Sequence, residues 1–148
     1  MATAIDDLWP SDIAASEGEV PPIAILKQQA SLLGQRTKNL LEAEVKTETD
    51  DFQRMFKHTL ILVAPALNFY RYPLLAVEHH VTKMYPATIK VTWLDKPPGD
   101  TILEISARNE EAFKSELRRV LGDDETKRVI ATLLAQSTGS QKGWSEFA

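Results

Sequence analysis

The residues of this chain best suited to chemistry are its histidines. The sequence holds three, namely His58 and the adjacent His79 and His80, which follow Glu78. Both stretches have the composition of β-strands, in which neighbouring side chains point to opposite faces. His79 and His80 therefore cannot serve one site together, and His79 is the one on the apolar face of its strand. If the two strands form a hairpin, we expect His58 and His79 to lie close together on the inward face.

Two inward histidines could bind a metal, act as a general acid–base pair, or form a proton-sensitive switch. The alternative is that they are core histidines, each satisfied by a hydroxyl or a backbone group. A zinc site needs three or four ligands, and the sequence offers no evident third inward ligand. His58 and His79 are therefore the candidate catalytic residues, and the sequence predicts no metal site and no cofactor.

Motifs of the large enzyme classes are missing from the sequence. There is no cysteine, which removes disulfide scaffolds, thiolate zinc sites and cysteine nucleophiles. The glycines form neither a dinucleotide-binding fingerprint nor a P-loop, and no GxSxG or HExxH motif occurs. The pattern therefore favours a non-enzymatic protein.

The middle of the chain predicts consecutive β-strands. Apolar Ile89, Val91 and Trp93 alternate with polar residues, which is the pattern of a strand with one face in water. The expected strands are Leu40–Thr49, Met55–Ala64, Pro73–Val81, Ala87–Leu94 and Thr101–Ser106, with a strong turn signal at Lys96–Asp100. Parallel crossovers need about a dozen residues, and the connections are shorter. We therefore expect an antiparallel meander of four to five strands.

Helical patterns flank this strand-rich block. The first helical pattern begins near Pro21, and its apolar residues recur at three- and four-residue steps. Gly34 either ends this helix or weakens it. After the strands, Asn109 is a good N-cap, and Gly122 interrupts the pattern before a further helical segment. The predicted fold class is α+β, with a single antiparallel sheet packed against an N-terminal helix and one broken or two short C-terminal helices. The predicted core comprises Ile23, Leu26, Leu33, Leu60, Leu62, Val77, Ile89, Val91, Phe113, Leu117, Ile130 and Leu133.

The two ends of the chain differ in composition from the single domain expected over residues 21–136. Residues 1–20 are acidic with few apolar side chains, and they predict a flexible tail. Residues 137–148 are rich in Ser, Gly and Gln and predict a second flexible tail. Trp9 stands beside Leu8 in a small apolar island. It either folds back onto the domain or anchors in a groove of a partner.

An aromatic loop is a further candidate site. Phe69, Tyr70, Arg71 and Tyr72 lie in the expected connection between the second and third strands. Tyrosine and arginine are residue types of interface hot spots, and aromatic rings also stack on nucleic-acid bases. Alternatively, the rings fold onto the edge of the sheet. These four residues and Trp9 are the candidate binding residues.

Charge and hydropathy restrict the partner classes and the cellular compartment that we expect. The formal charge is −4, with no basic run, which argues against nucleic-acid binding. The longest apolar runs fall short of the roughly 18–20 residues of a membrane span. The N-terminus lacks the basic-then-apolar order of a secretory signal. We therefore expect a cytoplasmic protein that does not enter a membrane.

The leading functional expectation is a protein-binding or regulatory module that acts by protein–protein contact or self-association. The acidic chain makes a basic protein one version of the partner, and a homodimer is another version. The alternative is a small-molecule-binding domain or small enzyme that uses the inward histidine pair between sheet and helices. A pocket enclosing His58 and His79 would favour that alternative.

Overall fold

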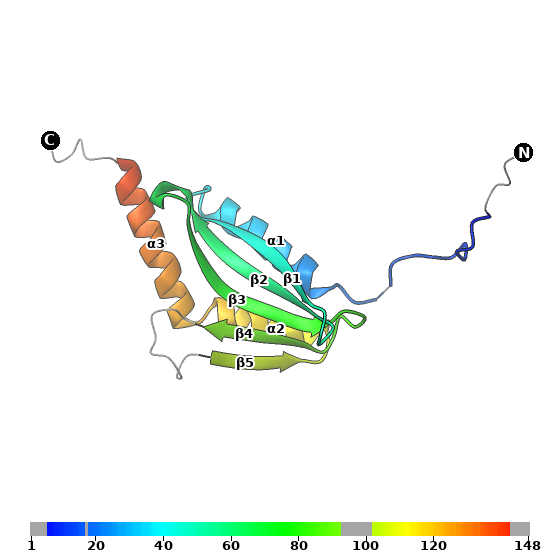
Figure 1. The fold of residues 1–148 in the computed structure, drawn as a ribbon. Helices are drawn as coiled ribbons and strands as arrows, with labels where there is room; N and C mark the ends of the chain where they lie inside the picture. The colour runs from blue at the N-terminus through cyan, green and yellow to red at the C-terminus, as the bar shows by residue number, and fades with distance from the viewer. Residues whose placement is uncertain (1–5, 17, 93–101, 143–148) are drawn as a thin grey trace, which may run out of the picture.

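The computed structural model describes residues 6–16, 18–92 and 102–142, and it confirms the predicted α+β class (Figure 1). The elements in chain order are α1 (Pro22–Arg36), β1 (Glu42–Asp50), β2 (Met55–Ala64), the 3₁₀ turn η1 (Pro65–Leu67), β3 (Tyr70–His80), β4 (Ala87–Thr92), β5 (Ile102–Ala107), α2 (Glu110–Leu121) and α3 (Asp124–Lys142). These strands form one antiparallel sheet in the order β1-β2-β3-β4-β5. The predicted meander is therefore confirmed.

Most of the core lies between the sheet and helices α1 and α2, and Val129 and Leu133 of α3 also belong to it. Helices α1 and α2 lie behind the sheet in the view of Figure 1, and α3 stands beside the end at which η1 joins β2 to β3. Leu26 of α1 and Phe113 of α2 pack with the strand residues of this face in one buried cluster. Of the predicted core residues, Ile23, Leu33 and Ile130 are only partly buried, and the others are buried.

The C-terminal helices begin as predicted, and the second of them extends further than expected. Asn109 caps α2, because its Oδ1 accepts the backbone N–H of Ala112 at 2.8 Å. Gly122 follows the last residue of α2, and α3 continues past the boundary expected at residue 136. Ser137 is fully buried within α3, so residues 137–142 are helical and do not begin a tail. Residues 143–148, the rest of the expected tail, lie outside the described residues.

β3 differs most from its predicted bounds. It starts at Tyr70, three residues early, because the chain from Tyr70 onward already pairs with the end of β2. The other strand ends lie within two residues of the prediction, and the turn signal at Lys96–Asp100 falls outside the described residues. In the pairing of β2 with β3 the register shifts between Leu60 and Ile61, which makes Leu74 an extra residue in β3.

This β-bulge decides which side chains of β3 face the helices. Strand alternation has a period of two, so one extra residue reverses the two faces beyond it. Tyr72 before the bulge and Val77 and His79 after it therefore all lie on the helix-covered face. Without the bulge, Tyr72 and His79 would point to opposite sides of the sheet.

The opposite face of the sheet carries cross-strand ion pairs. Arg71 of β3 pairs with Glu44 of β1 across the intervening β2. Lys90 of β4 pairs with Glu78 of β3 at 2.6 Å and with Glu104 of β5 at 3.7 Å. Exposed pairs of this kind contribute about 0–1 kcal/mol each. No helix in the described ranges combines the length and the apolar character that a membrane crossing requires.

Candidate functional site

The structure brings His58 and His79 together, as strand alternation predicted. Their Nε2 atoms lie 2.9 Å apart, and their ring centroids are separated by 5.0 Å. The two residues are only 3% and 6% exposed. His58 is paired across the strands with Val77, so His79 is its diagonal neighbour. The ring of Phe56 lies beside both imidazoles.

With both rings neutral, hydrogen-bond chemistry assigns a direction to every bond of this pair. His79 Nδ1 lies 2.9 Å from the carbonyl oxygens of both His80 and Lys83, and because carbonyls only accept, Nδ1 carries the hydrogen. In the neutral ring, His79 Nε2 then accepts from His58 Nε2–H. His58 Nδ1 in turn accepts the hydroxyl hydrogen of Thr47 at 2.9 Å. A single chain of hydrogen bonds therefore runs from Thr47 through both rings to the backbone.

The neutral chain leaves every ring nitrogen of the pair with a partner. Burial, with smaller effects from the neighbouring His79 ring and the Lys27 ammonium, lowers the pKa of His58 from 6.5 to about 4. A proton on both facing Nε2 atoms would set two N–H groups against each other across 2.9 Å. His58 is therefore neutral at pH 7.

The pair is enclosed by its surroundings. Two shallow pockets at this end of the sheet are lined by neighbours such as Phe56 and His80, and His58 and His79 line neither. In the described part of the chain, no group of three or more His, Cys, Asp or Glu residues could hold a metal ion. His80 points to the other face and contacts Thr82 Oγ1 at 2.9 Å. This geometry fits two core histidines satisfied by a hydroxyl and by backbone groups.

The aromatic loop is divided between surface and core. Phe69 and Tyr70 are exposed, whereas Arg71 is engaged with Glu44. Tyr72 is buried on the helix-covered face, because β3 begins before it. Phe69 has a φ of 56°, a left-handed conformation that costs a non-glycine residue roughly 1–2 kcal/mol. At this loop, Phe69 and Tyr70 are the aromatic rings that a partner can reach.

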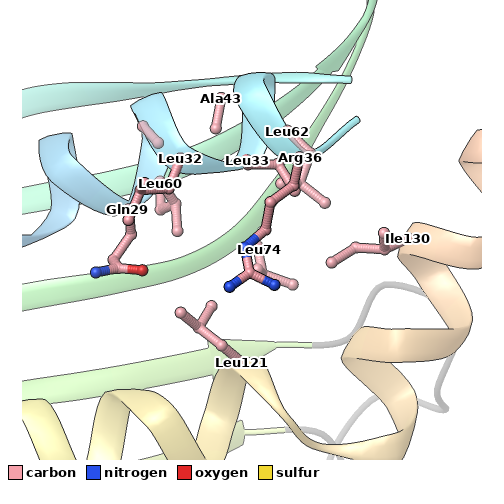
Figure 2. Close-up of a pocket in the computed structure, with 11 residues that line it drawn as sticks. Gln29, Leu32, Leu33, Arg36, Ala43, Leu60, Leu62, Leu74, Leu121 and Ile130 are labelled. Carbon is pink, nitrogen blue, oxygen red and sulfur yellow. The ribbon is translucent and has the colours of Figure 1, made fainter. Parts of the chain in front are cut away.

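A pocket that the sequence did not reveal lies where α1, α2 and α3 meet the sheet (Figure 2). Its volume is about 280 Å³. Apolar side chains form most of its lining, among them Leu33 of α1, Leu62 and Leu74 of the sheet, Leu121 of α2 and Ile130 of α3, and its polar lining residues are Gln29 and Arg36. The adjacent pair Leu32 and Leu33 is the sequence feature that could have indicated this pocket. Only one of two neighbouring helical side chains can point straight at the sheet.

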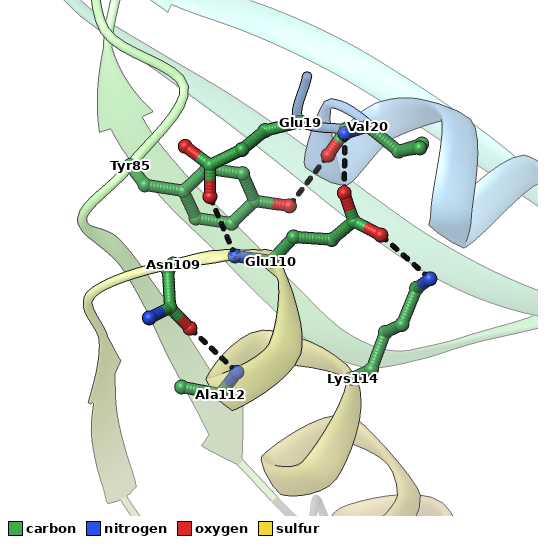
Figure 3. Close-up of polar contacts among 7 residues, drawn as sticks. All are labelled: Glu19, Val20, Tyr85, Asn109, Glu110, Ala112 and Lys114. Atoms are coloured by element: carbon green, nitrogen blue, oxygen red, sulfur yellow. Dashed lines mark hydrogen bonds and ion pairs between the residues drawn. The ribbon is translucent and has the colours of Figure 1, made fainter.

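The N-terminal segment is fixed to the domain at its root, Glu19 and Val20 (Figure 3). The Val20 N–H donates to Glu110 Oε1 at 2.6 Å, and the Val20 carbonyl accepts the Tyr85 hydroxyl at 2.6 Å. The Glu19 carboxylate accepts the backbone N–H of Glu110 at 3.0 Å. Lys114 donates to the second oxygen of Glu110 at 2.7 Å. Residues 19 and 20 therefore belong to the domain, although the sequence placed them in a tail.

Helix polarity explains why carboxylates gather at this root. The N-terminus of α2 has unpaired N–H groups and favours negative charge. Hydrogen bonds, first from Lys114 and then from the Val20 N–H, lower the pKa of Glu110. Burial, followed by the carboxylates of Glu110 and Glu19, raises the pKa of Tyr85 to about 12. The partners are 65 and 90 residues from Val20 along the chain, so no local pattern could have revealed them.

Beyond this root, the N-terminal segment extends away from the domain (Figure 1). Leu8 and Trp9 are 87% and 76% exposed, so Trp9 does not fold back onto the domain. Asp7 Oδ1 accepts the Trp9 N–H at 3.1 Å, which is an Asx-type turn. The segment therefore presents an aromatic ring on a locally ordered turn.

Comparisons of the chain with protein-family models, with curated proteins and with solved structures find no match. No relative therefore assigns a role to any of these residues. The function is inferred from their chemistry, exposure and geometry.

Proposed function

We propose that this protein is a protein-docking module whose N-terminal segment, residues 6–16, inserts into a partner. The observation that carries the proposal is a fixed root combined with an exposed apolar tip. Glu19 and Val20 hold the root on α2 and Tyr85. Leu8, Trp9 and Ile13 all expose more than half of their surface. Exposed apolar groups on one short segment are the anchors that a groove on another protein can bury.

The composition of the segment specifies the chemistry of the partner. Tryptophan dominates many interface hot spots, because it buries a large area and has few rotatable bonds. Asp6, Asp7 and Asp12 surround the apolar residues of the segment. A groove with an apolar floor and a basic rim would complement both features. The proposed partner is therefore a protein that carries such a groove.

The attached root favours docking by reducing the entropy cost of binding. Ordering a free backbone costs roughly 1–2 kcal/mol per residue. The hydrogen bonds at Glu19 and Val20 place the base of the segment before a partner arrives. The Asp7 turn also restricts the backbone at Trp9. The cost of ordering the chain then offsets a smaller part of the free energy gained by burying Leu8 and Trp9.

The experiment is quantitative affinity capture from an extract of the source cells. We expect the double variant Leu8→Ala, Trp9→Ala to recover at least about tenfold less partner than the wild-type chain, as for a hot-spot residue worth about 2 kcal/mol. Phe52→Ala is the matched control, because Phe52 is 97% exposed on the turn between β1 and β2. Unchanged recovery by the double variant would contradict the proposal. Loss of the partner with Phe69→Ala, Tyr70→Ala instead would move the docking surface to the β2–β3 loop.

If the partner is a second copy of this chain, the proposal is tested by a separate measurement. Sedimentation of the full chain over a range of concentrations should show a mass that increases with concentration. The double variant at Leu8 and Trp9 should remain at the monomer mass. Self-association that persists in the double variant would assign the contact to another surface.

A further inference from the structure

We propose that the pocket between α1, α2, α3 and the sheet binds a small single-chain carboxylate, with its aliphatic tail among the leucines and its carboxylate on Arg36. This site lies away from the N-terminal segment and does not depend on the docking proposal. It would make the protein a binder of short anionic amphiphiles.

The size and lining of the pocket fit the aliphatic part of such a ligand. The volume of about 280 Å³ is just below the range of roughly 300–1,000 Å³ typical of ligand pockets. The inner walls are Leu33, Leu62, Leu74 and Leu121, and Ile130 stands at the rim on α3 (Figure 2). Leu33, Leu121 and Ile130 are only partly buried. A tail that fills the pocket would therefore remove apolar surface from water.

The charge at the pocket fits an anionic head group. Arg36, in the last turn of α1, reaches into the space between α1 and Leu121 (Figure 2). A second hollow of about 440 Å³ shares Gln29, Arg36 and Leu121 with this pocket and adds Arg118 to the lining. Among the residues that the structure describes, neither Arg36 nor Arg118 has an ion-pair partner.

These two arginines form a local positive region on a chain whose net charge is −4. Lys114 also lines the second hollow, but Glu110 already neutralises it. Guanidinium groups bind carboxylates through two parallel hydrogen bonds. The Gln29 amide can supply a further donor. A carboxylate that emerges from the apolar pocket would therefore meet two available cations.

The competing occupant is the chain's own N-terminal segment, which is also apolar and acidic. Ile13 precedes Pro21 by eight residues, and an extended chain spans at most about 3.3–3.6 Å per residue, so the segment is long enough to fold along α1. In the structure it extends away from the domain (Figure 1), which leaves the pocket free.

The test uses octanoate, octylammonium and octanol as probes of the full chain, below their micelle-forming concentrations. Isothermal titration calorimetry gives the affinities, and amide chemical-shift changes locate the site. We expect saturable octanoate binding that shifts residues lining the pocket. We expect octylammonium to bind at least about tenfold more weakly, because its charge faces Arg36.

Three variants separate the tail from the head group. Arg36→Gln should weaken octanoate binding about tenfold and leave octanol binding unchanged, because only the charge-assisted hydrogen bonds are lost. Arg119→Gln is the matched control, because Arg119 pairs with Glu116 at 3.3 Å and lines neither hollow. Ile130→Trp should fill the rim and abolish binding of both octanoate and octanol. Circular dichroism checks that each variant is folded.

Five outcomes would overturn the inference. The first four are the absence of saturable octanoate binding, equal affinity for octanoate and octylammonium, an equal loss of affinity in Arg119→Gln, and chemical-shift changes outside the pocket. Octanoate binding that appears only after Leu8→Ala, Trp9→Ala would assign the pocket to the N-terminal segment, and it too would overturn the inference.

Discussion

Acidification should destabilise this protein through His58, and the variant His58→Gln should remove that part of the pH dependence. In the folded chain His58 is neutral, with its Nδ1 accepting from Thr47 and its Nε2–H donating to His79. Its folded-state pKa is lowered to about 4, from 6.5 for an exposed histidine. Below pH 6.5 the unfolded chain therefore binds a proton more readily than the folded chain. The contribution of His58 to the free energy of unfolding is therefore fully present above pH 6.5. It is lost progressively as the pH falls from 6.5 toward 4.

The size of the effect follows from these two pKa values. Between pH 7 and pH 5, the free energy of unfolding should fall by about 2 kcal/mol through this residue. Below pH 4 the loss should approach about 3 kcal/mol. Domains of ordinary stability unfold with about 5–15 kcal/mol, so the change is a large share of the total.

The assay is urea unfolding followed by far-UV circular dichroism at pH 7, 6 and 5. Glutamine offers a donor and an acceptor but does not titrate, so His58→Gln should show a fall between pH 7 and 5 that is smaller by about 2 kcal/mol. Titrating groups that do not contact His58 act in both proteins and cancel in the comparison. His80→Gln is the matched control, because His80 lies on the opposite face and contacts Thr82. It should behave like the wild-type chain.

Two results would refute this reasoning. One is a pH dependence in His58→Gln equal to that of the wild-type chain. The other comes from nitrogen–proton correlation spectra, which distinguish the imidazole tautomers. At pH 7 we expect hydrogen on His58 Nε2 and on His79 Nδ1. Hydrogen on His79 Nε2 alone would leave its Nδ1 facing two carbonyls without a donor, and the assigned chain would be wrong.

The remaining predictions concern the core and the helix ends. Phe113→Ala should lower the free energy of unfolding in urea by about 3–5 kcal/mol, because the ring is fully buried. Asn109→Ala should cost about 1 kcal/mol in the same assay, since the N-cap bond to Ala112 is lost; unchanged stability would show that this cap contributes nothing. Tyr85→Phe removes the bond to the Val20 carbonyl, and hydrogen exchange at the Val20 amide should become faster; an unchanged exchange rate would mean that Glu110 alone holds the root.

The candidate site could be predicted only in part. Alternation along two strands was enough to place His58 and His79 on one inward face, because that property is local. Their direction of hydrogen bonding was not accessible, because it depends on the carbonyls of His80 and Lys83 in the following turn. Tyr72 was a candidate binding residue in an expected loop, and it is buried in β3, because the start of β3 depends on pairing with β2.

The sequence by itself determined the α+β class, the antiparallel meander and the start of α2 at Asn109. These features follow from side-chain periodicity, connection length and capping, which act over a few residues. Only the tertiary structure decided the bulge at Leu74, the root of the N-terminal segment on α2, and the pocket beside Arg36. Each of these depends on contacts between residues far apart in the chain, and such contacts leave no local pattern.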